Sequence, residues 1–258
     1  SGLRWQGRVE LAQQLLSDNP YANVAALLAA LREGATAAQV AGATAYAAAL
    51  RIARFHTANE FGDWDTVLHT FTFANAMHRA VLRVTSAELD RMAPDATAEE
   101  RALPLLRGVF DAAMSVYLDR FLNTPPARIP QPKANGAAPE ALLAELPALL
   151  DRQQQVNQAG ELVAQYLASA GGTEVEHAAP LLAALGRGLL REDRDFHTVQ
   201  AIEAAMSQYQ LLAGTPEAAH VLIGAARYLA AHAPTVRAAG QTFQIAERLH
   251  RGEAIYEE

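Results

Sequence analysis

Alanine is the feature that most constrains what this chain can fold into. It fills about a fifth of the 258 positions, often in runs such as Ala25-Ala26 and Ala47-Ala48-Ala49. Alanine has the highest helix propensity of all residues and a low strand propensity. The chain is 51% apolar and only 19% charged, a balance that argues against disorder. The sequence therefore predicts an all-α protein with a substantial core.

About ten helices follow from the periodic apolar pattern and from the helix-start signals. Asp18-Asn19-Pro20 has the form of a cap followed by a proline at a helix start. Thr97-x-x-Glu100 and Thr173-x-x-Glu176 have the spacing of capping boxes, in which side chains satisfy backbone N–H groups at a helix start. The predicted helices span residues 4–17, 20–32, 36–57, 66–83, 86–92, 98–122, 139–169, 174–191, 194–213, 216–232 and 236–251.

A proline-rich segment, residues 123–138, divides the chain near its middle. It reads NTPPARIPQPKANGAA, and its four prolines exclude a regular helix. We expect residues 1–258 to form one helical domain, with this segment as an exposed connection between halves at about 20–122 and 155–232.

The two halves resemble a diverged internal duplication. Residues 65–70 and 193–198 align, and in each an aspartate precedes a His-Thr pair by four residues. Chance similarity between alanine-rich helices is the alternative. If the repeat is real, the halves pack about a pseudo-two-fold axis. His69 and His197 are then symmetry mates that face a shared cleft.

The charge pattern and the absence of cysteine exclude several function classes. The net charge is -7, the basic residues are scattered, and Lys133 is the only lysine, so nucleic acid and anionic membranes are poor partners. Without cysteine the chain has no disulfide, no thiolate catalysis and no cysteine-held metal. No uncharged apolar run reaches about 18 residues, so no transmembrane helix is expected. We expect a cytoplasmic protein whose Ser1-Gly2 start is a scar of tag removal.

Histidine is the candidate chemical group, with eight copies in the chain. If Asp65 and Asp193 are N-caps, His69 and His197 fall near the first turns of their helices. The helix dipole there disfavours imidazolium and leaves the neutral ring that metal binding needs. The sequence therefore predicts a divalent metal held by His69 and His197.

Further ligands and catalytic groups for this metal can be proposed from the same region. His56 and His232, at helix ends, are the next candidate ligands. Glu60, Asp63 or Glu203 would serve as a carboxylate ligand or a proton shuttle. A mixture of imidazole and carboxylate with open positions suits non-haem Fe(II), and zinc and manganese remain alternatives.

Two other interpretations of the histidines stay open. Each can be a capped, partly buried side chain that hydrogen-bonds to the backbone. Alternatively, Glu217-x-x-His220 and Glu247-x-x-His250 match the spacing found in ferritin-like di-iron bundles. Both pairs are poorly placed for this, because Glu217 lies in a first turn, where acids are favoured anyway, and His250 lies in a last turn, where a cation is favoured.

The segment FGDWDTVLHTFTFANAMH, residues 61–78, resembles the histidine-containing helix of questin oxidase-like proteins and of bacterial helical domains grouped with Rieske ferredoxins. Residues 195–198 and 228–232 extend the resemblance. It implies an all-α fold with a histidine-rich non-haem iron centre that acts with dioxygen on an aromatic, polyketide-like substrate. The chain departs from this family in length and in its single Lys133, because the family can use a modified lysine as a ligand. A Rieske cluster would need cysteines that this chain lacks.

The leading hypothesis is an iron-dependent oxidoreductase that acts on a small, largely apolar or aromatic molecule. Trp64, Phe71 and Phe73 lie close to His69 in sequence and are candidates for an apolar substrate pocket. The competing hypothesis is a non-catalytic helical module that docks a redox partner protein or another subunit. Stoichiometric metal in the purified protein would separate the two.

Overall fold

The computed structural model describes residues 5–92, 95–133, 137–152, 155–190, 196–232 and 236–253, and within these ranges every regular element is a helix. The all-α prediction is confirmed. The helices are α1 (Arg8–Leu15), α2 (Pro20–Arg32), α3 (Ala37–Ala53), α4 (Phe61–Val84), α5 (Ala87–Met92), α6 (Ala98–Leu118), the 3-10 helix η1 (Asp119–Leu122), α7 (Pro139–Leu150), α8 (Val156–Ala170), α9 (Val175–Gly188), α10 (Phe196–Leu212), α11 (Pro216–Ala231) and α12 (Val236–His250).

Two helices, α3 and α11, form the centre of the molecule. Both are buried along almost their whole length and pack against each other. A helix that is apolar on all sides is stable only when neighbours surround it. Small side chains let the two backbones approach closely, because a β-carbon at Gly224 of α11 would lie only 3.4 Å from the Ala49 carbonyl oxygen of α3. A glycine at this contact thus lets the two central helices pack closely.

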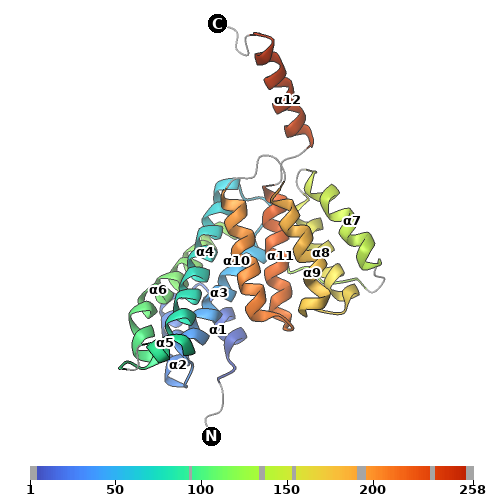
Figure 1. The fold of residues 1–258 in the computed structure, drawn as a ribbon. Coiled ribbons are helices and arrows are strands. Elements are labelled where there is room, and N and C mark those ends of the chain that lie inside the picture. Colours follow the sequence, from blue (N-terminus) through green and yellow to red (C-terminus); the bar gives the residue numbers. More distant parts are fainter. Residues whose placement is uncertain are drawn as a thin grey trace.

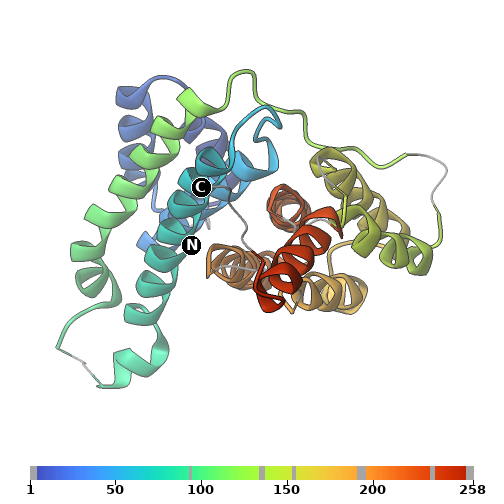
Figure 2. The same ribbon diagram turned by 90° about the horizontal axis from the view of Figure 1, so that it is seen from above.

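The remaining helices surround this pair in two groups. α1, α4 and α6 pack around α3, whereas α8 and α10 pack around α11. Figure 2 shows the groups side by side, with the segment after η1 running as a non-helical connection from one group to the other. Residues 123–133 of this segment contain no helix. The halves meet at α3 and α11, and the segment crosses that junction.

Helix starts agree with the sequence at several points. Asn19 caps α2, accepting a hydrogen bond from the Ala22 N–H, and Pro20 occupies the first turn. Thr97 and Glu100 form the capping box of α6. The box at Thr173 was a wrong prediction: α9 begins after Glu174, and the Thr173 hydroxyl donates instead to the Thr215 carbonyl.

The start of α4 differs from the prediction in a way that bears on the candidate site. The helix begins at Phe61 with Glu60 as its N-cap residue, five residues earlier than expected. Asp65 is therefore not an N-cap, and His69 lies beyond the second turn, where the helix dipole has little effect. The matching cap at Asp193 lies outside the described residues.

The predicted helix over 139–169 is in fact two helices, α7 and α8. The duplication remains a prediction. Its alignment pairs α3 with α9, yet α3 is buried almost throughout and α9 is buried on one face only.

The last helix, α12, projects away from the helices that precede it (Figure 1). Its described side chains include the exposed Phe243, Ile245 and Leu249. Of the helices in the described ranges, none combines the length and hydrophobicity needed to cross a bilayer.

Candidate functional site

The structure places His69 and His197 side by side. His69 lies on α4 and His197 on α10, and their ring centroids are 5.1 Å apart in an edge-to-face arrangement. His69 is exposed and His197 is half-buried, with the Phe196 ring 3.9 Å from the His197 ring. Two imidazole rings from different helices therefore lie next to each other at the surface.

The other two predicted ligands lie elsewhere. His232 stacks on Tyr228, and its Nε2 lies 3.1 Å from Asp65 Oδ1. The Tyr228 hydroxyl donates to the same Asp65 oxygen at 2.7 Å, so Asp65 connects α4 to α11. His56 lies in the loop after α3, where its Nδ1 accepts a hydrogen bond from the Ala58 N–H.

The predicted carboxylates do not join the two histidines. Asp63 accepts a hydrogen bond from the Glu60 backbone N–H at the start of α4. Glu203 is exposed and pairs with Arg79 at 2.5 Å. His220 hydrogen-bonds to Tyr46, and Glu247 pairs with Arg251. Nowhere in the described ranges do three His, Asp or Glu side chains converge in a way that could hold a metal ion.

The aromatic cluster near His69 is mostly core. Trp64 and Phe71 are buried, and the void beside Phe71 has a volume of only about 10 Å³, too small for a substrate. Phe73 is exposed on the surface of α4. The apolar pocket that we expected here is therefore not formed by these residues.

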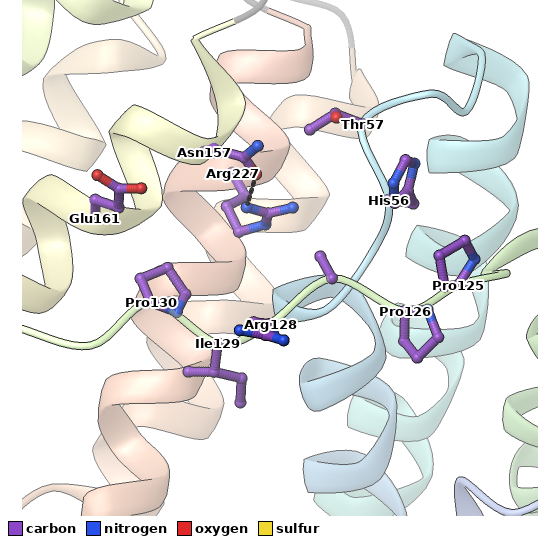
Figure 3. Close-up of a pocket in the computed structure, with 11 residues that line it drawn as sticks. His56, Thr57, Pro125, Pro126, Arg128, Ile129, Pro130, Asn157, Glu161 and Arg227 are labelled. Atoms are coloured by element: carbon purple, nitrogen blue, oxygen red, sulfur yellow. Dashed lines mark hydrogen bonds between the residues drawn. The ribbon is translucent and has the colours of Figure 1, made fainter.

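A larger cavity, of about 380 Å³, lies where the proline-rich segment crosses the junction of the two halves. Figure 3 shows its wall, which is built from the loop after α3, the segment 125–130, α8 and α11. We call it the junction cavity. Its lining side chains are those of His56, Thr57, Pro125, Pro126, Ala127, Arg128, Ile129, Pro130, Asn157, Glu161 and Arg227.

Arg227 of α11 is the unusual residue of the junction cavity. Its side chain is 1% exposed, yet it carries a charge. Its Nη1 donates to Asn157 Oδ1 at 2.7 Å and its Nη2 donates to the Phe55 carbonyl at 2.6 Å, whereas its Nε has no hydrogen-bond partner among the described residues. A guanidinium has five N–H donors, so the protein leaves part of its donor capacity unused.

No carboxylate of the described residues lies within 4 Å of Arg227. Burial lowers the pKa of its guanidinium to about 10, so the group remains charged at neutral pH. Buried charges in proteins are normally paired, because an isolated charge loses its hydration. The arrangement therefore leaves a cation that an anion entering the cavity would neutralise.

A glycine on α8 makes room for this arginine. A β-carbon at Gly160 would lie 3.1 Å from Arg227 Cγ and 3.3 Å from Pro130 Cγ. These distances are tighter than ordinary contacts, so Gly160 allows α8, α11 and the proline-rich segment to meet at the arginine stem.

A second buried arginine, Arg51 of α3, does not line the cavity. Its Nη2 donates to the Val116 carbonyl, and burial lowers its pKa to about 10. The charge of Asp119 acts on it, and burial raises the pKa of Asp119 itself to about 7. Asn123 follows η1, and its Oδ1 accepts a hydrogen bond from the His56 N–H, which links this cluster to the cavity wall.

No protein-family model, curated protein or solved structure matches the chain. The junction cavity must therefore be interpreted from its own geometry.

Sequence reasoning missed Arg227, although a signal was present. It lies in the segment VLIGAARYLAA, in which apolar or small residues occupy every side of the helix. Such a helix is buried, so the one charged residue in it must be buried too. The adjacency of His69 and His197, in contrast, was expected from the alignment of the two halves.

Proposed function

We propose that this protein binds a small molecule carrying a carboxylate, with the carboxylate bound by Arg227 in the junction cavity. The observation that carries the proposal is that the buried Arg227 is one of the residues that line the cavity, and that its guanidinium has no carboxylate partner among the described residues. Arginine presents paired N–H donors that match the two oxygens of a carboxylate.

The size of the junction cavity agrees with this class of ligand. Small-molecule sites usually occupy about 300–1,000 Å³ and combine apolar walls with a few polar groups. At about 380 Å³ the cavity is at the small end of that range, and its wall combines apolar residues, three prolines among them, with polar and charged ones. A metabolite-sized molecule fits such a space better than a polymer does.

The charges around the cavity favour a monoanion over a phosphate dianion. Arg128 adds a second positive charge to the lining, but Glu161 contributes a negative one. A dianion would meet repulsion from Glu161 with few extra donors to offset it. We therefore expect carboxylates to bind more tightly than inorganic phosphate.

Thermal unfolding with added anions tests the proposal. We expect 4-methylpentanoate at ten times its Kd to raise Tm by about 3–6 °C, since a ligand that binds only the folded state stabilises it. Arg227→Lys should lose most of this shift, because a point charge cannot replace the paired donors. Thr57→Trp, which fills the cavity from an exposed loop, should lose it without touching the arginine.

Arg51→Lys is the matched control, because Arg51 is similarly buried but does not line the cavity. It should retain the carboxylate-induced shift. The proposal is wrong if no carboxylate raises Tm of the wild-type protein, or if Arg227→Lys and Thr57→Trp both respond as the wild type does.

A second candidate function follows from the pair of imidazoles. We propose that His69 and His197 bind a divalent metal, with Fe(II) as the leading candidate. The two histidines would then be the core of the oxidoreductase site expected from the sequence. The 5.1 Å separation of their rings supports this candidate. Nothing comparable supports His56, His232 or the three carboxylates as further ligands.

Metal analysis of protein produced in iron-supplemented medium tests this second candidate. Stoichiometric metal should be present in the wild type and largely lost in His69→Ala and His197→Ala. His250→Ala, at the exposed end of α12, should retain it. Metal-free wild-type protein that gains no thermal stability from added Fe²⁺, Mn²⁺ or Zn²⁺ would rule the candidate out.

A further inference from the structure

We infer that the carboxylate ligand of the junction cavity also carries an ammonium group, and that it is an α-amino acid with an apolar side chain. Its carboxylate would bind Arg227 and its ammonium would bind Glu161. This inference rests on the proposed function and names the class of ligand for the same site.

The first argument is the register of two residues on α8. Asn157 and Glu161 are four residues apart, so they lie on the same face of the helix, one turn or about 5.4 Å apart. Asn157 accepts a hydrogen bond from Arg227, so the guanidinium lies beside Asn157. The Glu161 carboxylate lies one turn along the same wall (Figure 3).

The second argument is that these opposite charges line one cavity without pairing. No ion pair joins Arg227 to Glu161, which places their charged atoms more than 4 Å apart. Glu161 instead faces Lys133 at 3.6 Å, and the Lys133 side chain is 79% exposed. An exposed pair of this kind contributes little stability, so a ligand ammonium can compete for the carboxylate.

A molecule that bridges the two groups needs a negative end and a positive end separated by a short distance. A zwitterion of the amino-acid type has this form. A simple carboxylate would satisfy Arg227 alone, and a simple amine would leave the buried arginine without an anion. Of the three, only the zwitterion offers a charged partner to both Arg227 and Glu161.

The third argument is the apolar part of the wall. Pro125, Pro126, Ile129 and Pro130 present rings and methyl groups to the cavity. Burial of apolar surface contributes about 25 cal/mol per Å². An aliphatic side chain is therefore favoured over a charged one.

Calorimetric titration with three related probes tests this inference. The probes are L-leucine, 4-methylpentanoate, which lacks the amine, and 3-methylbutylamine, which lacks the carboxylate. We expect L-leucine to bind about tenfold more tightly than 4-methylpentanoate. This is the gain in affinity expected from one charge-assisted hydrogen bond between the ligand ammonium and Glu161. The amine alone should show no measurable binding.

Two variants separate the role of Glu161 from a general effect of charge. In Glu161→Gln the preference for L-leucine over 4-methylpentanoate should fall to about twofold or less. Glu145→Gln, an exposed glutamate on α7 that does not line the cavity, should keep the full preference.

The results distinguish this inference from the proposed function. If L-leucine and 4-methylpentanoate bind the wild type equally, or if Glu161→Gln keeps the preference, the amino-acid assignment is wrong and the carboxylate site remains. If neither probe binds, both proposals fail.

Discussion

Asp119 shows how strongly single residues depend on their position in this fold. Its side chain is 4% exposed, and burial raises the pKa of its carboxyl group to about 7, although a hydrogen bond from Thr70 and the charge of Arg51 act in the opposite direction. In an unfolded chain the pKa of an aspartate is about 3.9. The folded state therefore holds a proton on Asp119 that the unfolded state has already lost near pH 5–6.

This difference predicts how stability depends on pH. Because the folded state binds more protons between about pH 4 and pH 7, the free energy of unfolding should fall as pH rises through this window, by roughly 4 kcal/mol at most. Asp119→Asn cannot ionise and should lose this contribution. The free energy of unfolding of the variant minus that of the wild type should therefore be larger at pH 8 than at pH 5.

Urea denaturation of both proteins at pH 5, 6, 7 and 8 measures the effect. Asp111→Asn, which changes an exposed aspartate on α6, is the control and should follow the wild type. Stability curves of the wild type and Asp119→Asn that run parallel across this range would contradict the assignment of a raised pKa to Asp119.

The contact between helices α8 and α11 determines where Arg227 lies. Gly160→Ala would place a β-carbon 3.1–3.2 Å from the Cγ and Cδ atoms of Arg227, so the side chain must shift by a few tenths of an ångström. We expect the affinity for 4-methylpentanoate to fall by threefold to tenfold, or on the order of 1 kcal/mol. The measurement is the same calorimetric titration.

Gly186→Ala on α9 provides a matched control. Its β-carbon would lie 3.5 Å from Met206 Cε, which is an ordinary contact, and it does not line the cavity. This change should leave affinity unchanged and raise stability by up to about 1 kcal/mol, since alanine favours the helix. An unchanged affinity in Gly160→Ala would show that the position of Arg227 is not limited by this contact.

The elements differ in how well the sequence predicted them. α2 and α6 begin at residues whose side chains cap the helix, so their starts could be predicted from a few neighbouring residues alone. α4 begins earlier than expected: Glu60 is its N-cap residue and Asp63 accepts a hydrogen bond from the Glu60 N–H, whereas the sequence pattern predicted Asp65 as the N-cap. The separation of α7 from α8 has no proline or glycine to mark it in DRQQQ, residues 151–155.

At the scale of the whole molecule, the candidate site depends on contacts that no local pattern contains. The similarity of the segments that contain His69 and His197 predicted that these residues lie close together, and their rings are 5.1 Å apart. The junction cavity was not, because it forms where the segment 125–130 crosses α8 and α11, three parts of the chain far apart in sequence. Proline content indicated a connection between halves but not that the connection would form the wall of a cavity.

The two buried arginines allow the central claim to be tested within one sample. The Nε atoms of Arg227 and Arg51 both lack a hydrogen-bond partner among the described residues, but only Arg227 lines the junction cavity. Their Nε–H signals in ¹H–¹⁵N spectra can be assigned from the spectra of Arg227→Lys and Arg51→Lys. Titration with 4-methylpentanoate should move the Arg227 signal in a saturable manner and leave the Arg51 signal in place. An Arg227 signal that stays fixed, or that moves together with the Arg51 signal, would contradict the proposal that this cavity binds a carboxylate.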